Sequence, residues 1–273
     1  MKWTPLPIEL AKCIDQYLFS YIIYRFGGTS NKVAMMFVSA DYAIQSTKKM
    51  KWIPENKWIH LAPMVRERKH AAATLVNNQY IYVTGGFCSY LNCFLADVER
   101  YDIATNSWKQ MAPLNHKRAN HTCLFWNHSL YVIGGTDHYL DPLFSPLGME
   151  TYDLSDNEAT WIIKKAMLHY LYGSTFGVSL GDWFYLCISE FYMYHVPTDT
   201  IHRHADSPDS VDFYKCIPII WNMDCIAFMT RENREFIYFY HISSNSWFPN
   251  PDFKLVHPLY PTHQKAGFCI QSS

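Results

Sequence analysis

Two short basic segments contain the side chains with the most evident binding chemistry in this sequence. Arg66 and Arg68 lie within residues 65–69, and Lys117 and Arg118 lie within residues 115–119. An arginine guanidinium donates two parallel hydrogen bonds to one carboxylate, so these segments predict a site for an acidic peptide. Polar and aromatic side chains that would complete the site follow two glycine pairs. They are Tyr90 and Asn92, then His138 and Tyr139.

Catalytic and metal-binding patterns are much less evident. His202 and His204 would lie on one face of a strand, but this spacing is also common for polar residues that face solvent. Cys88 and Cys93 have no second cysteine or histidine pair at zinc spacing nearby. The sequence contains no Gly-x-Ser-x-Gly, no phosphate-binding loop and no His-Glu-x-x-His. We therefore expect no catalytic residue, no metal site and no cofactor.

A repeated pattern indicates which elements position the basic segments. The phrase Tyr80-Ile-Tyr-Val-Thr-Gly-Gly recurs as Leu130-Tyr-Val-Ile-Gly-Gly, with the glycine pairs 49 residues apart. Each pair precedes an acidic residue, a Tyr-Asp dipeptide and a tryptophan: Glu99, Tyr101, Asp102 and Trp108, then Glu150, Tyr152, Asp153 and Trp161. A period of about 40 to 50 residues built from short apolar strands is typical of β-propeller blades. The alternative is a β-sandwich in which two strands are similar by chance.

The repeat also predicts local structure. Residues 70–76 and 80–84 have the length and composition of strands around a turn at 77–79, and residues 127–129 predict the matching turn in the next unit. Each glycine pair is expected to end a buried strand, at positive φ or against a neighbouring backbone. Since the strands pack within the blades, the loops after the glycine pairs and the two basic segments are expected to share one functional face.

Incomplete copies of the pattern bring the number of units to five. They begin near Tyr21, Trp183 and Cys225, and the last two lack the glycines. Residues 266–271 resemble the first strand of a unit, so we expect them to pair beside residues 21–26 and close the propeller. Residues 1–20 then form a short helix or the remnant of a preceding domain, and residues 21–273 form the propeller.

Composition agrees with a large protein core and a nearly neutral surface. Apolar residues make up 49% of the chain and aromatic residues 17%, and the formal net charge is −1. No whole-chain charge favours nucleic acid or an anionic membrane. No segment resembles a signal peptide or reaches the roughly 20 apolar residues that span a bilayer. The eight cysteines are therefore expected to be reduced thiols in a cytoplasmic protein.

Together, the glycine pair, Glu-x-Tyr-Asp, the tryptophan and Ala-Pro-Met at residues 62–64 resemble the kelch repeat. The pattern is particularly similar to the kelch half of BTB-kelch proteins, which are substrate adaptors of cullin-type ubiquitin ligases. This resemblance implies a non-enzymatic module that binds a protein partner or substrate peptide. In such adaptors, arginine, serine, asparagine and tyrosine side chains on these loops hold an acidic peptide. The matching residues here are Arg66, Arg68, Lys117 and Arg118, with Tyr90, Asn92, His138 and Tyr139.

Two departures limit what the resemblance implies. Members of that group usually have six blades, whereas this sequence shows five units. It also shows neither a BTB nor a BACK domain, so we do not expect it to recruit a cullin by that route. Kelch-fold enzymes, such as copper oxidases and sugar mutarotases, are the alternative class. We rank them second because the metal-ligand and export signals that they need are not evident.

Overall fold

The computed structural model describes residues 21–26, 33–38, 59–138, 148–164, 175–188, 190–203, 216–230, 237–250 and 267–272. Strands, turns and extended segments make up these ranges, and no helix occurs within them. The N-terminal segment 1–20, for which we predicted a helix or the remnant of another domain, lies outside the described residues. So does Tyr139, one of the predicted site residues.

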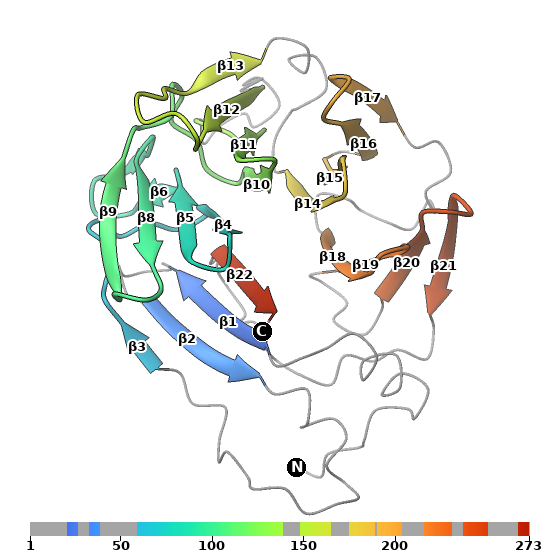
Figure 1. The fold of residues 1–273 in the computed structure, drawn as a ribbon, viewed down its shortest axis with the longest axis horizontal. Helices are drawn as coiled ribbons and strands as arrows, with labels where there is room; N and C mark the ends of the chain where they lie inside the picture. The colour runs from blue at the N-terminus through green and yellow to red at the C-terminus, as the bar shows by residue number, and fades with distance from the viewer. Residues whose placement is uncertain are drawn as a thin grey trace, which may run out of the picture.

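Five antiparallel sheets of four strands account for most of the described chain. Figure 1 shows these sheets arranged around a common centre, with β22, β4, β10, β14 and β18 innermost. From the inner to the outer strand, the sheets are β22 (Gly267–Ser272), β1 (Tyr21–Phe26), β2 (Val33–Val38) and β3 (Ile59–Leu61); β4 (Ala72–Val76), β5 (Tyr80–Thr84), β8 (Val98–Asp102) and β9 (Ser107–Met111); β10 (Thr122–Trp126), β11 (Ser129–Ile133), β12 (Met149–Asp153) and β13 (Ile162–Lys164); β14 (Phe176–Leu180), β15 (Trp183–Cys187), β16 (Phe191–His195) and β17 (Thr200–Arg203); β18 (Cys216–Asn222), β19 (Cys225–Thr230), β20 (Ile237–His241) and β21 (Ser246–Asn250). This architecture confirms the predicted all-β, kelch-type propeller.

The first sheet contains both ends of the described chain. β22 pairs antiparallel with β1, so that Gly267 lies opposite Phe26 and Ser272 lies opposite Tyr21. This register places the C-terminal strand beside residues 21–26, as the sequence predicted. β22 also contacts β4, the inner strand of the next sheet. The last strand of the chain therefore supplies the inner strand of the first blade, which would otherwise have an unpaired edge.

Apolar side chains fill the space between neighbouring blades. One buried cluster joins the third and fourth sheets, and within it the rings of Tyr131 and Phe184 meet edge to face at 5.1 Å. Another cluster joins the fourth and fifth sheets, where the rings of Phe191 and Phe228 are 5.3 Å apart. Aromatic rings suit these contacts because each buries a large area and the edge-to-face geometry is itself favourable. The high aromatic content of the sequence therefore reflects packing between neighbouring blades.

In the second and third blades, the repeated tryptophan connects the blade to the segment that precedes it. Trp108 packs on Tyr101, with ring centroids 5.0 Å apart, and its Nε1 donates a hydrogen bond of 2.8 Å to the carbonyl oxygen of Ala62. Trp161 Nε1 donates in the same way to Ala112, at 2.9 Å. The apolar ring of the indole packs against the tyrosine, and its single N–H donor satisfies the backbone carbonyl oxygen. The motif is therefore explained by packing at the outer edge of the propeller.

Both glycine pairs occupy positions that a side chain would strain. Gly85 and Gly134 have φ values of +54° and +67°, in the left-handed region. A Cβ at Gly85 would overlap the carbonyl oxygen of Arg118, and one at Gly134 would overlap the side chain of Thr175. Each first glycine thus combines positive φ with a close neighbour, as expected from the sequence.

The hairpin turns also follow the prediction. Asn127 and His128, with φ of 41° and 62°, connect β10 to β11. Asn77 and Asn78, with φ of 52° and 53°, lie between β4 and β5. Positive φ at consecutive residues matches the right-handed twist of the flanking strands, and asparagine tolerates it better than most residues.

Candidate binding face

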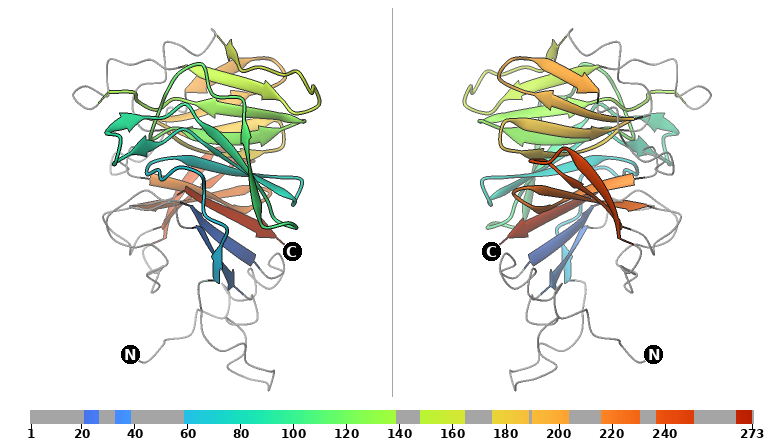
Figure 2. Two further views of the ribbon diagram at one scale, coloured as in Figure 1. Left: turned by 90° about the vertical axis from the view of Figure 1, so that its left-hand side faces the viewer. Right: turned by 90° about the vertical axis from the view of Figure 1, so that its right-hand side faces the viewer.

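The two basic segments and the loops after the glycine pairs meet at one end of the second and third blades. Lys69 and Phe87 exchange backbone hydrogen bonds of 2.9 and 2.7 Å, and Ala119 and Thr136 exchange two of 2.9 Å. We call this end, formed by residues 64–71, 85–97, 114–121 and 134–138, the loop face. A short hairpin of β6 (Phe87–Cys88) and β7 (Cys93–Phe94) lies within it. Figure 2 shows this hairpin, in teal, projecting from one side of the sheets.

Arg68 lies beneath the loop face and not on it. Its side chain is completely buried, and Nη1 donates hydrogen bonds of 2.9 Å to the carbonyl oxygens of both Gly85 and Asp97. Nη2 forms an ion pair with Glu99, which is also completely buried. Burial lowers the pKa of Arg68, and the charge of Glu99 opposes this shift. An arginine still carries its proton at neutral pH, so the pair is ionic.

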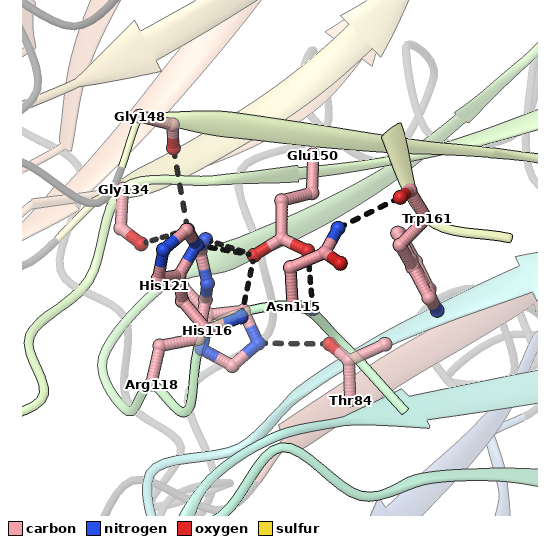
Figure 3. Close-up of polar contacts among 9 residues, drawn as sticks. All are labelled: Thr84, Asn115, His116, Arg118, His121, Gly134, Gly148, Glu150 and Trp161. Atoms are coloured by element: carbon pink, nitrogen blue, oxygen red, sulfur yellow. Dashed lines mark hydrogen bonds and ion pairs between the residues drawn. The ribbon is translucent and has the colours of Figure 1, made fainter. Parts of the chain in front are cut away.

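Arg118 repeats this arrangement one blade later. Its Nη1 donates to the carbonyl oxygens of Gly134 at 2.8 Å and Gly148 at 3.2 Å, while Nη2 lies 2.5 Å from Glu150 Oε1. Figure 3 shows the guanidinium between the two glycine carbonyls and the carboxylate. Neither charged side chain is exposed, and burial again lowers the pKa of the arginine. The fork of each arginine thus holds together three segments of its own blade.

These positions correct our expectation for Arg68 and Arg118. We predicted that both would lie on an exposed rim and hold the carboxylates of a partner, but both are buried and paired with carboxylates of the chain itself. The physical reason is that each loop carries several backbone carbonyl oxygens that must be satisfied, and a buried guanidinium supplies donors to two of them. Their role here is to fix the shape of the loop face.

Glu99 and Glu150 are the partners of the two buried arginines, whereas we predicted them only as parts of the repeat. Besides its arginine, Glu99 accepts a 2.8 Å hydrogen bond from the backbone N–H of Val65. Glu150 accepts bonds of 2.6 and 3.1 Å from the backbone N–H groups of Asn115 and His116. The available signal was the spacing, because the arginine precedes its glutamate by 31 residues in one repeat and 32 in the next.

Other predicted site residues do lie on the surface of the loop face. Tyr90, at the tip of the β6–β7 hairpin, is 87% exposed, and Asn92 beside it is also exposed. Lys117 and His138 are exposed in the third blade. Two apolar residues that we did not predict, Val65 and Leu91, are 73% and 50% exposed on the same loops. The exposed part of the loop face is therefore more aromatic and apolar than we expected.

The tip of the hairpin is held in place by a carboxylate from the neighbouring loop. Glu67 Oε1 accepts a 3.0 Å hydrogen bond from the backbone N–H of Tyr90 and lies 3.9 Å from Cys88 Sγ. At the base, Lys69 Nζ lies 5.3 Å from the centre of the Phe87 ring. Such contacts between the loops present Tyr90 to solvent on a defined support, which reduces the ordering cost of binding.

Charges on the loop face are largely balanced. Arg66 Nη1 lies 3.1 Å from Asp97 Oδ2, with the arginine side chain 44% exposed. His138 Nδ1 lies 2.5 Å from Asp137 Oδ1. Since Arg68 and Arg118 are neutralised in the interior, the local positive patch that we predicted reduces to Arg66 and Lys117.

Two further structural features are absent from the described residues. No group of three or more histidine, cysteine, aspartate or glutamate side chains is arranged there to hold a metal ion. Within the same ranges, no helix is long and apolar enough to cross a membrane.

Comparison with known proteins identifies the class of repeat to which this fold belongs. Residues 68–115 match the model of the kelch motif, a segment that begins at Arg68 and includes Glu99. The chain is 27% identical to kelch-like protein 36 of Rattus norvegicus over 107 residues, which cover 38% of this chain and 17% of the relative. It is 33% identical to kelch-like protein 23 of Homo sapiens over 70 residues, which cover 26% and 12%. Beta-scruin of Limulus polyphemus is 32% identical over 88 residues, covering 30% and 10%.

This chain is therefore a kelch-repeat β-propeller related to the kelch-like proteins. The match spans less than a fifth of the length of each of these relatives. The kelch motif and these relatives agree with the propeller fold described above.

Proposed function

We propose that the chain is a non-enzymatic module that binds a protein partner through its loop face. The observation that carries the proposal is the hairpin tip, where Tyr90 is 87% exposed although its backbone is bonded to Glu67. A rigid, exposed tyrosine surrounded by apolar and amide side chains is typical of the residues that dominate binding energy at interfaces. Leu91 and Asn92, which follow Tyr90 in the turn, supply those neighbours, and Val65 is exposed on the adjacent loop.

An acidic segment of the partner remains our proposal for the charged part of the contact. Of the four predicted cations, Arg66 and Lys117 are the exposed ones, and Arg66 is shared with Asp97. Exposed charges contribute little affinity each and are screened by salt. We therefore infer that the aromatic hairpin provides most of the affinity and that the cations orient the partner. The resemblance to ubiquitin-ligase adaptors suggests that the partner is a substrate to be ubiquitinated, and the cysteine usage suggests a cytoplasmic location.

Site-specific photo-crosslinking tests the proposal directly. A p-azidophenylalanine at Tyr90 replaces the tyrosine with a side chain of nearly the same shape, and the same probe at Ala104 serves as the control. Ala104 is exposed in the turn 103–106, at the opposite end of the strands. In extracts of the source cell under reducing conditions, we expect discrete crosslinked proteins from position 90 and not from position 104. Crosslinks from position 104 alone would place the binding surface on the opposite face.

Metal analysis of the purified chain tests the alternative class. Stoichiometric copper would favour a kelch-fold oxidase over an interaction module. Its absence would leave the crosslinking result to decide whether the loop face binds a protein.

A further inference from the structure

The β6–β7 hairpin places two cysteines directly opposite each other. β6 and β7 pair antiparallel, with Phe87 opposite Phe94 and Cys88 opposite Cys93. Both thiols are free, Cys88 is 2% exposed, and Cys93 is partly exposed. In an antiparallel pair, residues directly opposite each other project their side chains from the same face. The two sulfur atoms therefore lie on the same side of the hairpin.

Backbone geometry at this pair suits a disulfide. Opposite residues in antiparallel strands have Cα atoms about 4.5 to 5.5 Å apart, within the range of about 4.4 to 6.8 Å that disulfides span. The register is secured on the side of the pair that faces away from the turn. Leu95 N–H donates to the carbonyl oxygen of Gly86 at 2.8 Å, and the rings of Phe87 and Phe94 meet edge to face at 5.2 Å. A disulfide needs the two Cβ atoms about 3.8 Å apart, and a ribbon of two-residue strands permits the adjustment that brings them there.

No other cysteine in the described strands lies opposite a second cysteine. The residues opposite them are Val132 for Cys123, Phe176 and Phe191 for Cys187, Thr230 for Cys216, Asn222 and His241 for Cys225, and Tyr24 for Cys269. Burial raises the pKa of Cys123 to about 12 and that of Cys225 to about 11, so their thiolates are scarce at neutral pH. The buried thiols of Cys123, Cys187 and Cys225 pack in the core and provide internal controls for the oxidation experiment described below.

We propose that Cys88 and Cys93 are a thiol modification site that forms a reversible intramolecular disulfide with small disulfides such as oxidised glutathione. The thiolate of Cys93, the more exposed residue, attacks one sulfur of the oxidant, forms a mixed disulfide and releases one glutathione thiolate. The thiolate of Cys88 then attacks Cys93 Sγ and releases the second glutathione. Two protein thiols are oxidised, one glutathione disulfide is reduced to two thiols, and the two protein protons end on the glutathione.

Oxidation at this site would act on the turn that carries Tyr90. Residues 89–92 connect the two cysteines, and the N–H of Asn92 is 3.4 Å from the carbonyl oxygen of Ser89 across the turn. A disulfide at the base of the turn restricts the positions of Tyr90 and Asn92 relative to the rest of the loop face. Control of partner binding by this change rests on the proposed function, whereas formation of the disulfide does not.

Peptide mapping of the full chain gives a sharp test, because trypsin releases residues 70–100 as one peptide with Cys88 and Cys93 as its only cysteines. The folded protein is equilibrated in mixtures of reduced and oxidised glutathione at neutral pH, quenched with acid, alkylated and digested. We expect this peptide to be two hydrogens lighter and unalkylated in the oxidised sample, and dithiothreitol should reverse the change. Peptides that contain Cys123, Cys187 and Cys225 should remain fully alkylatable.

Two comparisons distinguish a site built by the fold from accidental oxidation. Cys88→Ser should accumulate a glutathione adduct on Cys93, since the resolving thiol is missing, and Cys93→Ser should lose the disulfide without a comparable adduct on buried Cys88. The folded chain should also be half-oxidised at a ratio of oxidised to reduced glutathione about tenfold lower than the same chain in urea. Two alkylated cysteines in the folded wild type, or equal ratios with and without urea, would overturn the proposal.

The functional consequence is tested separately by crosslinking from position 90 with the reduced and the oxidised protein. A change in yield supports control of the partner by the disulfide. An equal yield with the disulfide formed removes that link and leaves the modification site intact.

Discussion

Arg118 and Glu150 form an ion pair inside the third blade, with Nη2 and Oε1 2.5 Å apart and neither side chain exposed. The pair joins the loop that enters the blade to β12. In the second blade, Arg68 and Glu99 join the corresponding loop to β8. Breaking a buried ion pair from one side costs more than the pair contributes as a whole, because it leaves an uncompensated charge in the interior. The predictions that follow separate such internal contacts from those of the exposed loop face.

We expect Arg118→Ala to reduce the free energy of unfolding by about 3 to 5 kcal/mol, because Glu150 would remain buried without its partner. Chemical denaturation measures the effect. Lys117→Ala, at the exposed neighbouring position, is the matched control and should change stability by less than about 0.5 kcal/mol. Equal unfolding midpoints for the two variants would show that the buried pair does not stabilise the loop.

Valine at Gly85 or Gly134 should destabilise the fold by about 3 kcal/mol or more, since each position combines positive φ with an overlapping neighbour. Gly181→Ala isolates the cost of the positive φ from that of the overlapping neighbour. Gly181 has φ +58°, but no atom lies within 4 Å of an added Cβ. Its substitution should cost only about 1 kcal/mol. Comparable losses in all three variants would contradict the steric part of the argument.

Removal of residues 267–273 should lower the melting temperature markedly, because β1 would lose its inner partner and expose a strand edge. Deletion of Ser273 alone, which follows β22, is the control and should leave thermal unfolding unchanged. If the longer deletion melted at the same temperature as the intact chain, the first blade would not depend on the C-terminal strand.

Tyr90→Ala should weaken binding of the crosslinked partner by about 1 to 3 kcal/mol and leave the melting temperature nearly unchanged, because the side chain is exposed. Lys117→Ala should have a smaller effect on affinity that disappears at high salt. Titration of the purified partner at two salt concentrations measures both. An unchanged affinity for Tyr90→Ala would remove the hairpin tip from the interface.

Stability should fall at alkaline pH. Burial raises the pKa of Tyr240 to about 12, and its hydroxyl donates a 2.8 Å hydrogen bond to Asn245. A folded-state pKa above the unfolded value of about 10 stabilises the protein fully below pH 10, and that contribution is lost as pH rises toward 12. The absorbance of tyrosinate should therefore increase cooperatively with unfolding. Tyr240→Phe, which has no ionisable group, should show a shallower loss of stability over this range.

Much of the fold could be predicted from the sequence because its determinants are local. The spacing of strands and turns and the recurrence of glycine, tyrosine and tryptophan all act over a few residues or within one repeat. The pairing of β22 with β1 was also predictable, since a unit that lacks its first strand and a chain that ends in such a strand complement each other. The same local reasoning predicted that the loops around Arg68 and Gly86 would meet.

Which charges reach the surface was decided only by the tertiary structure. Arg66 and Arg68 are two residues apart on one basic segment, yet the first is partly exposed beside Asp97 and the second is buried beside Glu99. The sequence determined that the segment is basic and that it follows a blade. The direction of each side chain depends on how the loop crosses the end of the next sheet, where unpaired backbone carbonyl oxygens require donors. A guanidinium that satisfies them from the interior is no longer available to a partner.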